Sequence, residues 1–359
     1  IDDIRVTKSA LRPQEFLRGV DQPLEKVSFD SPETVLPKSS GYIDVRAGFG
    51  AVGDGKHDDT AALNRAFECV SNKHVAHYLT LYLPPGEFLV SQPLHCNRFV
   101  IIQGAGRDRT TIRLSDHAGG FHDPDNPEPV IRASSTKTAP GSNRAVNGSS
   151  IGIYFADLTI DTGSGNPGAK GIEYHSNNHG SLERVDIISG DGKGAVALDL
   201  SHKCNGPALI KDVRIDGFDF GAVIKYAEYS MTLENVTMTN QRKAAILNQS
   251  NVLAIRRLTS VNRVPAIQSL GGGSMVTLLD SELTGGDASV PAIECEGAFY
   301  GRNIAVEGYR ESLRKRVYQW NGWKQKPAFE WRDGITLAGD ITEWWGGSPT
   351  APKGREKPG

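Results

Sequence analysis

A three-residue strand motif recurs through the second half of this sequence, and it constrains the fold more than any other feature. Its seven copies are separated by 27, 28, 23, 22, 23 and 23 residues. They begin at Leu158, Val185, Val213, Val236, Leu258, Ser281 and Ile304. A second short strand is predicted in most periods, starting with a small residue at Gly171, Ala195, Ala222, Ala245, Ala266 and Ala292. Each repeat therefore carries two strands.

A repeat of 22–28 residues is too short to bury an apolar face by itself, so neighbouring repeats must stack and form parallel sheets. Leucine-rich repeats have a similar period, but their LxxLxL consensus is absent and no helix fits inside a 22-residue unit. Propeller blades need about 40 residues each. The pattern predicts an all-β fold, a right-handed parallel β-helix over residues 41–310.

The segment before the repeats predicts one helix that caps the β-helix. Apolar residues follow a 3.6-residue period from Thr60 to about Val70, and Asp58 or Asp59 is placed to cap the helix N-terminus. The apolar positions are Ala61, Leu63, Ala66, Phe67 and Val70. Residues 116–149, rich in Gly, Pro, Asn, Ser and Asp, predict a long loop.

The two ends of the chain differ from the repeats in composition. Residues 1–40 are polar and contain four prolines, which predicts an extended arm. Residues 311–346 contain all five tryptophans and predict a segment that covers the open end of the β-helix. Residues 347–359 have the composition of a linker.

Charge and cysteine content limit the function classes. The net charge of −2 lacks the basic excess of a nucleic-acid binder. No stretch reaches the ~20 apolar residues that span a bilayer. The four cysteines form no CxxC pair, so neither a zinc site nor a dense disulfide framework is indicated. We expect no metal site and no membrane partner. A chain that begins at Ile1 without Met favours a mature secreted or periplasmic protein.

Three specific motifs lie between residues 44 and 106. They read DVRAGFGAVGDG and DDTAAL over residues 44–63, LYLPPGEFLV over 81–90 and IQGAG over 102–106. These segments resemble the pectate-lyase-like β-helix superfamily, which includes polygalacturonase-like glycoside hydrolases, tandem β-helix exo-β-1,3-glucanases and many phage tailspikes. The resemblance implies the β-helix fold and a polysaccharide or oligosaccharide partner.

The resemblance specifies the fold more closely than the reaction. The polygalacturonase pattern of Asn-Thr-Asp, Asp-Asp and Gly-His-Gly is absent from the repeats, and residues 178–180, Asn-His-Gly, echo it only in part. The end of the chain resembles the first half of the tandem glucanase-like proteins, in which a linker follows a repeat ending near Tyr309. A second β-helix domain or a homotrimer is therefore an expected partner.

Strand alternation predicts which side chains of the second strand face solvent. We take Ile172, Val196, Ala222, Ala245, Ile267 and Ile293 as inward-facing. The outer row is then His175, Asp199, Lys225, Asn248, Leu270 and Glu296, and the row before it is Glu173, Ala197, Val223, Ile246, Gln268 and Glu294. Choosing Val223 and Ile246 as the inward positions would place Tyr226 and Gln249 in the outer row instead.

His175, Asp199, Lys225 and Glu296 are the candidate catalytic residues on this wall, together with Glu228. Glycoside hydrolysis needs two carboxyl groups roughly 5–5.5 Å or 6.5–9.5 Å apart, and repeats about 4.8 Å apart supply such spacings. Glu228 is the preferred acid because neighbouring tyrosine rings would desolvate it. The structural alternative for Asp199 and Lys225 is a solvated ion pair that contributes at most ~1 kcal/mol.

Polar and aromatic residues in the turns after these strands suit a carbohydrate ligand. The candidate binding residues are Asn177, His179, Tyr226, Tyr229, Asn248 and Gln249, and His202 and Lys203 lie in an equivalent turn. The favoured function is a glycoside hydrolase without a cofactor. One alternative is a polysaccharide lyase, in which Lys225 or an arginine removes the proton next to a uronate carboxylate, with or without Ca²⁺. The other is a non-catalytic carbohydrate-binding or assembly module.

Overall fold

A computed structural model of the chain describes residues 41–71, 79–134, 150–226, 229–271, 273–315, 319–320 and 323–324. Several predictions fall on other residues. The N-terminal arm over 1–40, the linker over 347–359, most of the tryptophan-rich segment and Glu228 lie outside the described part.

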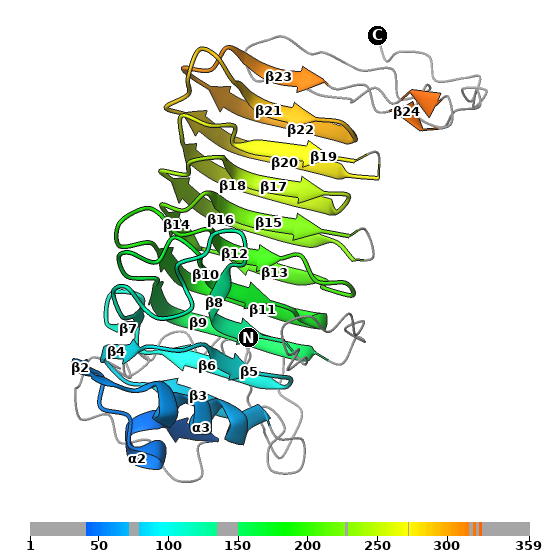
Figure 1. Ribbon diagram of the computed structural model, residues 1–359. Helices are drawn as coiled ribbons and strands as arrows, with labels where there is room; N and C mark the ends of the chain where they lie inside the picture. The colour runs from blue at the N-terminus through cyan, green and yellow to red at the C-terminus, as the bar shows by residue number, and fades with distance from the viewer. Residues whose placement is uncertain are drawn as a thin grey trace, which may run out of the picture. The chain divides into compact units, whose positions relative to one another are not determined.

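Two parallel sheets run the length of the described chain (Figure 1). Sheet A has fourteen strands: β1 (Tyr42–Asp44), β2 (Asp54–Asp58), β3 (Thr80–Leu83), β4 (Gly86–Val90), β6 (Val100–Gly104), β7 (Thr110–Leu114), β9 (Ile151–Asp161), β11 (Asn177–Ile188), β13 (Ala208–Lys211), β14 (Arg214–Asp216), β16 (Met231–Thr239), β18 (Val252–Val261), β20 (Met275–Thr284) and β22 (Ala298–Val306). Sheet B has nine: β5 (Leu94–Cys96), β8 (Glu128–Ala133), β10 (Ala169–Tyr174), β12 (Val196–Leu200), β15 (Phe220–Lys225), β17 (Ala244–Gln249), β19 (Ile267–Leu270), β21 (Pro291–Cys295) and β23 (Glu311–Lys315). The predicted all-β parallel β-helix is confirmed.

The register of sheet A matches the predicted repeats. Leu158 lies opposite Val185, Val236 opposite Leu258, and Ser281 opposite Ile304. All six residues are buried between the two sheets, and all except Ser281 are apolar. Stacking thus buries a face that no single repeat could bury alone.

In each of the seven repeats from β9 to β22, sheet A bends at one residue, the one just before the repeated motif. These residues have positive φ between 50° and 59°, a region that L-amino acids rarely adopt and that Asn and Asp tolerate best. They are Asp157, Arg184, Asp212, Asn235, Arg257, Asp280 and Asn303. We call this set the corner column. The side chains of some neighbouring members bond to each other, as where Asn303 Nδ2 donates to Asp280 Oδ1 at 2.8 Å.

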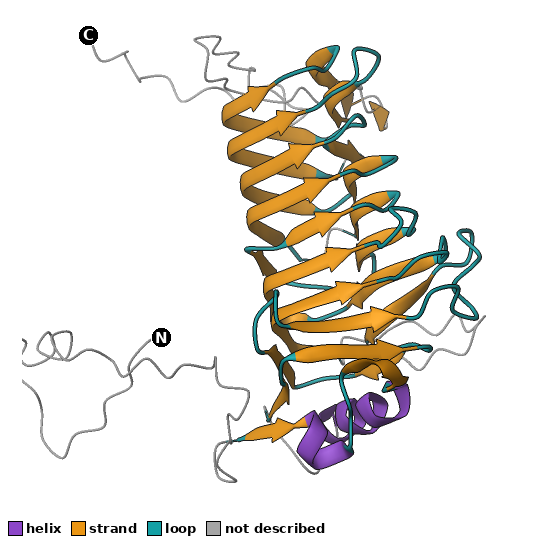
Figure 2. Cartoon of the chain, turned by 90° about the vertical axis from the view of Figure 1, so that its left-hand side faces the viewer, coloured by secondary structure: helices purple, strands orange, loops and turns teal. Residues whose placement is uncertain are grey.

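The N-terminal end of the stack carries two helices, α2 (Val45–Phe49) and α3 (Thr60–Ser71). Helix α3 lies across the end of the strands in both views (Figures 1 and 2). It buries Leu63, Ala66, Phe67 and Val70, as the periodicity predicts, whereas Ala61 is exposed. Asp58 accepts a hydrogen bond from the Thr60 backbone N–H at 2.9 Å. No described helix is long and apolar enough to cross a membrane.

Two sequence-based expectations about the elements differ from the structure. Residues 128–133 lie inside the predicted long loop but form β8, because Val130 and Ile131 enter the core. Strand β23 pairs with β21, so the β-helix continues to Lys315 rather than ending at 310. Beyond it, β24 (Gln319–Trp320) and β25 (Trp323–Lys324) form an antiparallel pair.

The predicted register of sheet B is wrong in two repeats. Ile172 lies opposite Leu198, two residues beyond the predicted Val196, because residues 195–198, Ala-Val-Ala-Leu, contain the small-aliphatic pattern twice. Ala222 lies opposite Ile246 rather than Ala245, since two adjacent alanines precede the isoleucine. The alternative choice of Ile246 as the inward residue is the correct one.

Candidate functional site

The outer face of sheet B carries a group of six charged or titratable side chains from β8, β10, β12 and the turn after β12. They are Glu128, Arg132, Lys170, Glu173, Asp199 and His202. We call them the sheet B cluster. All six side chains are largely or partly shielded from solvent, and Glu173 and Asp199 are buried.

The strand register brings the cluster together. Arg132, Glu173 and Asp199 occupy equivalent positions on three neighbouring strands. Side chains at equivalent positions of adjacent parallel strands are separated by about the strand spacing of 4.8 Å, so oppositely charged neighbours meet. Lys170 precedes Glu173 on β10, and His202 follows β12 by two residues.

The contacts within the cluster are short. Lys170 Nζ donates to Asp199 Oδ2 at 2.6 Å and lies 3.7 Å from Glu173 Oε2. Arg132 donates through Nε to Glu173 Oε1 at 3.2 Å and through Nη2 to Glu128 Oε2 at 2.6 Å. His202 Nε2 lies 3.1 Å from the same Glu173 oxygen. Glu173 is therefore the shared partner of three nitrogen-bearing side chains.

These contacts decide the protonation state of Glu173. Burial alone would raise the pKa of this carboxyl group, but the hydrogen bond from His202 and the charges of His202, Arg132 and Lys170 outweigh burial and lower the pKa to about 2. Glu173 is thus ionised at any ordinary pH. An ionised carboxylate can only accept hydrogen bonds, so the proton shared with His202 belongs to His202 Nε2.

The ring of His202 also stacks on His175, with ring centroids 5.0 Å apart and planes 8° apart. The prediction that His175 faces solvent is wrong, because its side chain is fully buried and its Nε2 lies 3.3 Å from the Cys204 carbonyl oxygen. Its Nδ1 is buried without a hydrogen-bond partner. Burial, followed by the charge of His202, lowers the pKa of His175 to about 4.

The other predicted catalytic residues are not gathered at one place. Asp199 belongs to the cluster, but its cation is Lys170 and not Lys225, because Asp199 lies opposite Val223. Lys225 is exposed, with Nζ 5.7 Å from the centre of the Tyr226 ring. Glu296 accepts the Gly271 backbone N–H at 2.7 Å, which is a turn contact.

The predicted binding residues also separate. Asn248 is fully buried rather than outward-facing, and its amide bonds to Asn251 and Ser269, because the register of β17 is shifted by one residue. Asn177 is buried at the start of β11. His179 Nδ1 lies 2.7 Å from the Tyr154 hydroxyl.

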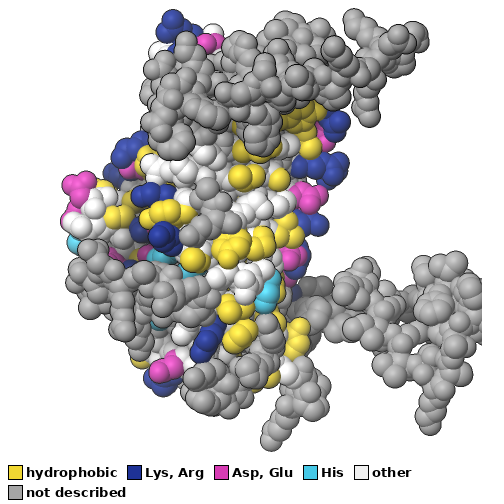
Figure 3. All heavy atoms as spheres, turned by 90° about the vertical axis from the view of Figure 1, so that its right-hand side faces the viewer, with side chains coloured by type: hydrophobic (Ala, Val, Ile, Leu, Met, Phe, Trp, Pro, Cys, Tyr) yellow, Lys and Arg dark blue, Asp and Glu magenta, His cyan; other side chains and the backbone are white. Residues whose placement is uncertain are grey.

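Tyr226 and Tyr229 remain candidates for a sugar platform. Both are more than one-third exposed, in the turn that follows β15, and Gln249 lies at the matching end of β17. On the side of the molecule where the sheet B strands end, apolar side chains gather along the face and charged groups lie around them (Figure 3). Such a mixture of apolar and polar groups suits sugar rings and hydroxyl groups.

Sequence reasoning missed most of the cluster. Arg132 lies in a segment whose composition predicts a loop, and no sequence motif singles out Lys170, although Lys170 and Glu173 are three residues apart on one strand. The sequence predicts Glu173 on the wall and His202 in a turn, without indicating that either reacts. The nearest signal was the row containing Glu173, which the register error separated from Asp199.

The cluster combines a carboxylate-oriented imidazole with two cations on one rigid wall. Imidazole is the commonest general base in enzymes, and orientation by a carboxylate fixes its tautomer. Guanidinium and ammonium groups stabilise negative charge that develops on a substrate. Among the described residues, no group of three or more His, Cys, Asp or Glu side chains is arranged to hold a metal ion.

Curated relatives of the chain are polysaccharide-active enzymes. A probable glucan endo-1,3-beta-glucosidase from Arthroderma benhamiae is 24% identical over 66% of this chain and 27% of its own length. Alginate lyase 7 from Azotobacter vinelandii is 32% identical over 39% of this chain and 16% of its own. Mannuronan C5-epimerase AlgE3 from the same organism is 33% identical over 54% of this chain and 10% of its own length. The chain thus spans less than a third of these relatives.

Solved structures give a more distant likeness. The A-module of mannuronan C-5 epimerase AlgE6 from Azotobacter vinelandii matches with a TM-score of 0.45 and 16% identity, over 80% of this chain and 84% of that chain. The glycan biofilm modifying enzyme WceF from Pantoea stewartii matches with a TM-score of 0.47 and 11% identity, over 85% of this chain and 44% of that chain. Both are too distant to bear on function.

A family model matches residues 42–265, which is more than half of the chain and includes the whole sheet B cluster. Its description is rhamnogalacturonase A/epimerase, pectate lyase-like. The chain belongs to this family.

Proposed function

We propose that this chain acts on acidic polysaccharides at the sheet B cluster, by removing the proton on the carbon next to a uronate carboxylate. The observation that supports this most directly is the hydrogen bond between His202 and an ionised Glu173, with Arg132 and Lys170 beside it. Proton abstraction of this kind is the shared first step of polysaccharide lyases and uronate epimerases.

His202 is the proposed base. Since Glu173 fixes the proton of His202 on Nε2, the lone pair of the neutral ring is on Nδ1, and Nδ1 takes the substrate proton. Glu173 positions the ring and stabilises the imidazolium that forms. Stacking on His175 restricts the ring further.

Arg132 and Lys170 are the proposed counter-charges. When the proton leaves, the electron pair moves onto the uronate carboxylate, and nearby cations lower the energy of that dianion. The pair then either expels the glycosidic oxygen on the next carbon, which takes a proton from water and leaves a double bond, or takes a proton from water on the opposite face, which inverts the carbon. We propose that these two side chains, held in position by their carboxylate partners, take this role without a metal.

Glycoside hydrolysis is the second candidate. It is favoured by the proximity of Glu173 and Asp199 on neighbouring strands and by the glucosidase among the relatives. Hydrolysis needs one protonated carboxyl group as the general acid. Glu173, with a pKa of about 2, cannot serve as that acid near neutral pH, and this ranks hydrolysis below proton abstraction.

Several of the relatives support an acidic substrate. Several are named as mannuronan C5-epimerases or as an alginate lyase, which act on polymers of uronic acids. We infer from such a substrate that the protein is secreted or periplasmic. A second β-helix domain or a homotrimer remains our proposal for its assembly, and the mass of the purified protein in solution would test the trimer.

The deciding experiment incubates the purified chain with alginate, polymannuronate, polygalacturonate and β-1,3-glucan, in D₂O and H₂O. An unsaturated lyase product absorbs ultraviolet light, an epimerase incorporates deuterium without chain cleavage, and a hydrolase releases reducing ends with neither signal. We expect absorbance or deuterium incorporation on a uronate polymer, unchanged by EDTA.

Variants identify the residues involved. His202→Asn should lower turnover by about 10²–10⁴-fold, the usual contribution of a general base. Glu173→Gln should lower it by about tenfold or more because the ring loses its orientation. Glu282→Gln, an exposed glutamate on β20, is the control and should retain full activity. Full activity in His202→Asn would refute the role of His202 as the base. If the wild-type protein binds a polymer but turns over none of them, the proposal that the chain is an enzyme is wrong.

A further inference from the structure

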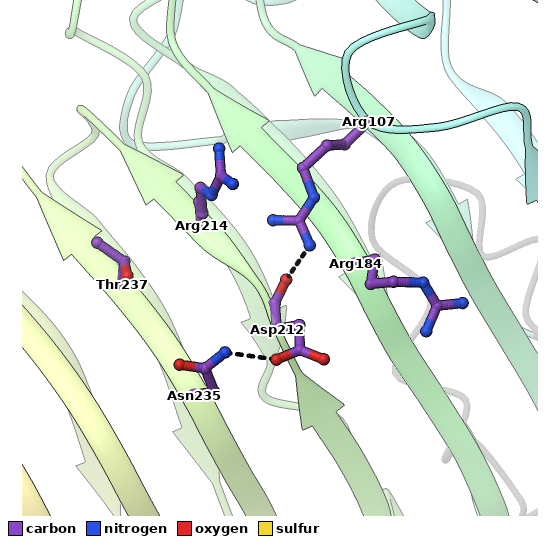
Figure 4. A pocket seen from close by; sticks show the side chains of 6 residues that line it. All are labelled: Arg107, Arg184, Asp212, Arg214, Asn235 and Thr237. Atoms are coloured by element: carbon purple, nitrogen blue, oxygen red, sulfur yellow. Dashed lines mark hydrogen bonds between the residues drawn. The ribbon is translucent and has the colours of Figure 1, made fainter.

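A cavity lies on the outer face of sheet A, beside the corner column. Its volume is about 280 Å³, and it is lined by Arg107, Arg184, Asp212, Arg214, Asn235 and Thr237. The residues come from the loop after β6 and from β11, β14, β16 and the segment between β13 and β14 (Figure 4). We call this cavity the corner pocket. It is distinct from the cluster, which lies on the outer face of sheet B.

The three guanidinium groups are held in place to different degrees. Arg184 is fixed to Asp157 by two bonds of 2.6 and 2.9 Å. Arg107 donates to Asp186 Oδ1 at 2.9 Å and to the Asp212 carbonyl oxygen at 2.8 Å. Arg214 is 64% exposed, and its nearest carboxylate contact, to Asp186, is 3.7 Å. That distance is too long for a hydrogen bond.

Arg214 therefore places a guanidinium group at the cavity that is not hydrogen-bonded to a carboxylate. A guanidinium group binds a carboxylate through two parallel N–H bonds, which gives both charge and direction. Arg107 adds a second cation whose position is fixed by its own two contacts. Together they favour an anionic group in the cavity over a neutral one.

The remaining lining favours a hydroxylated ligand. The Asp212 side chain, which accepts a bond from Asn235 Nδ2, can also accept sugar hydroxyl groups, and Thr237 and the Asn235 amide add neutral polar contacts (Figure 4). A carboxylate next to the cations would repel a simple inorganic anion more than it would a ligand that brings donors of its own. The volume is at the lower end of small-ligand sites.

We propose that the corner pocket binds one acidic sugar residue, with its carboxylate on Arg214 and Arg107 and its hydroxyl groups on Asp212 and Thr237. This gives the protein a second, non-catalytic contact with a uronate polymer on the sheet opposite the cluster. Binding here does not depend on the reaction proposed for the cluster. It is measured as binding and not as turnover.

The test is isothermal titration of the full chain with trigalacturonate, with its methyl ester and with inorganic sulfate. The variant Arg214→Gln removes the exposed guanidinium group and leaves the buried residues unchanged. The matched control is Arg256→Gln, an exposed arginine on β18 of the same sheet that is paired with Asp280 at 3.4 Å. We expect Arg214→Gln to lose one binding site, or to weaken it by about tenfold or more, because a charge-assisted pair is removed. The control should match the wild type.

The outcomes separate this site from the cluster. If both sites bind, the wild-type stoichiometry is two and Arg214→Gln leaves one; if only the corner pocket binds, the variant leaves none. Unchanged binding in Arg214→Gln overturns the proposal, whatever the cluster does. If the wild-type protein binds the methyl ester as tightly as trigalacturonate, the ligand's carboxylate does not contribute to binding. If it binds sulfate as tightly as trigalacturonate, the pocket does not recognise a sugar.

Discussion

The buried His175 should make the protein sensitive to acid. Its pKa falls from 6.5 to about 4 in the folded chain because burial, and then the charge of His202, disfavour the protonated ring. Between these two values the unfolded chain binds a proton that the folded chain does not. Stability therefore falls as the pH falls from about 6.5 towards 4, and each pH unit in that window costs about 1.4 kcal/mol, or about 3 kcal/mol in total.

The variant His175→Gln isolates this contribution. Glutamine keeps a donor for the Cys204 carbonyl oxygen but does not titrate, so acid should cost the variant about 3 kcal/mol less than the wild type. Urea unfolding at pH 7 and pH 4, followed by circular dichroism, measures the difference for each protein. His122→Gln, which changes an exposed histidine, should lose as much stability in acid as the wild type. Equal acid losses in His175→Gln and wild type would falsify the reasoning.

Two further predictions concern stability, and both are checked by denaturant unfolding at pH 7. Asn248→Val should lower the free energy of unfolding by about 2–4 kcal/mol because it leaves the buried Asn251 N–H without its acceptor, whereas Gln249→Val should change it by less than about 0.5 kcal/mol; similar losses would contradict the assigned register. Arg257→Asn should raise the free energy of unfolding by about 0.5–1 kcal/mol because φ is 55° there, and Arg256→Asn, one residue earlier in extended strand, should show no such gain.

The fold could be predicted because its signals repeat. Every copy of the motif on sheet A places apolar residues inward at the same positions of the repeat. The register of one ambiguous copy can therefore be inferred from the other copies. Sheet B offers weaker signals. Residues 195–198 and 244–246 each contain two acceptable small residues next to an aliphatic one, and the sequence does not state which of the two faces the core.

The site was harder to predict than the fold because its members come from separate repeats. One register shift of two residues moved Asp199 away from Glu173 and placed it beside Lys225 in the predicted row. Arg132 lies on a strand surrounded by loop-like sequence. A single sequence also does not reveal that His175 is buried while His202 is partly exposed. The exposure of each ring depends on the path of the turn that follows its strand, β10 for His175 and β12 for His202.

The corner column determines where a repeat can change its length. Because each of the seven repeats from β9 to β22 bends at one equivalent residue with the same backbone conformation, these repeats differ in length at their other turns, whereas the earlier corner between β6 and β7 has five residues, 105–109. The turn between β12 and β13 has seven residues, 201–207, whereas the turn between β17 and β18 has two, 250–251. The longer turn carries His202. The segment that supplies the proposed base can therefore change in length while the stacked strands beneath it stay in register.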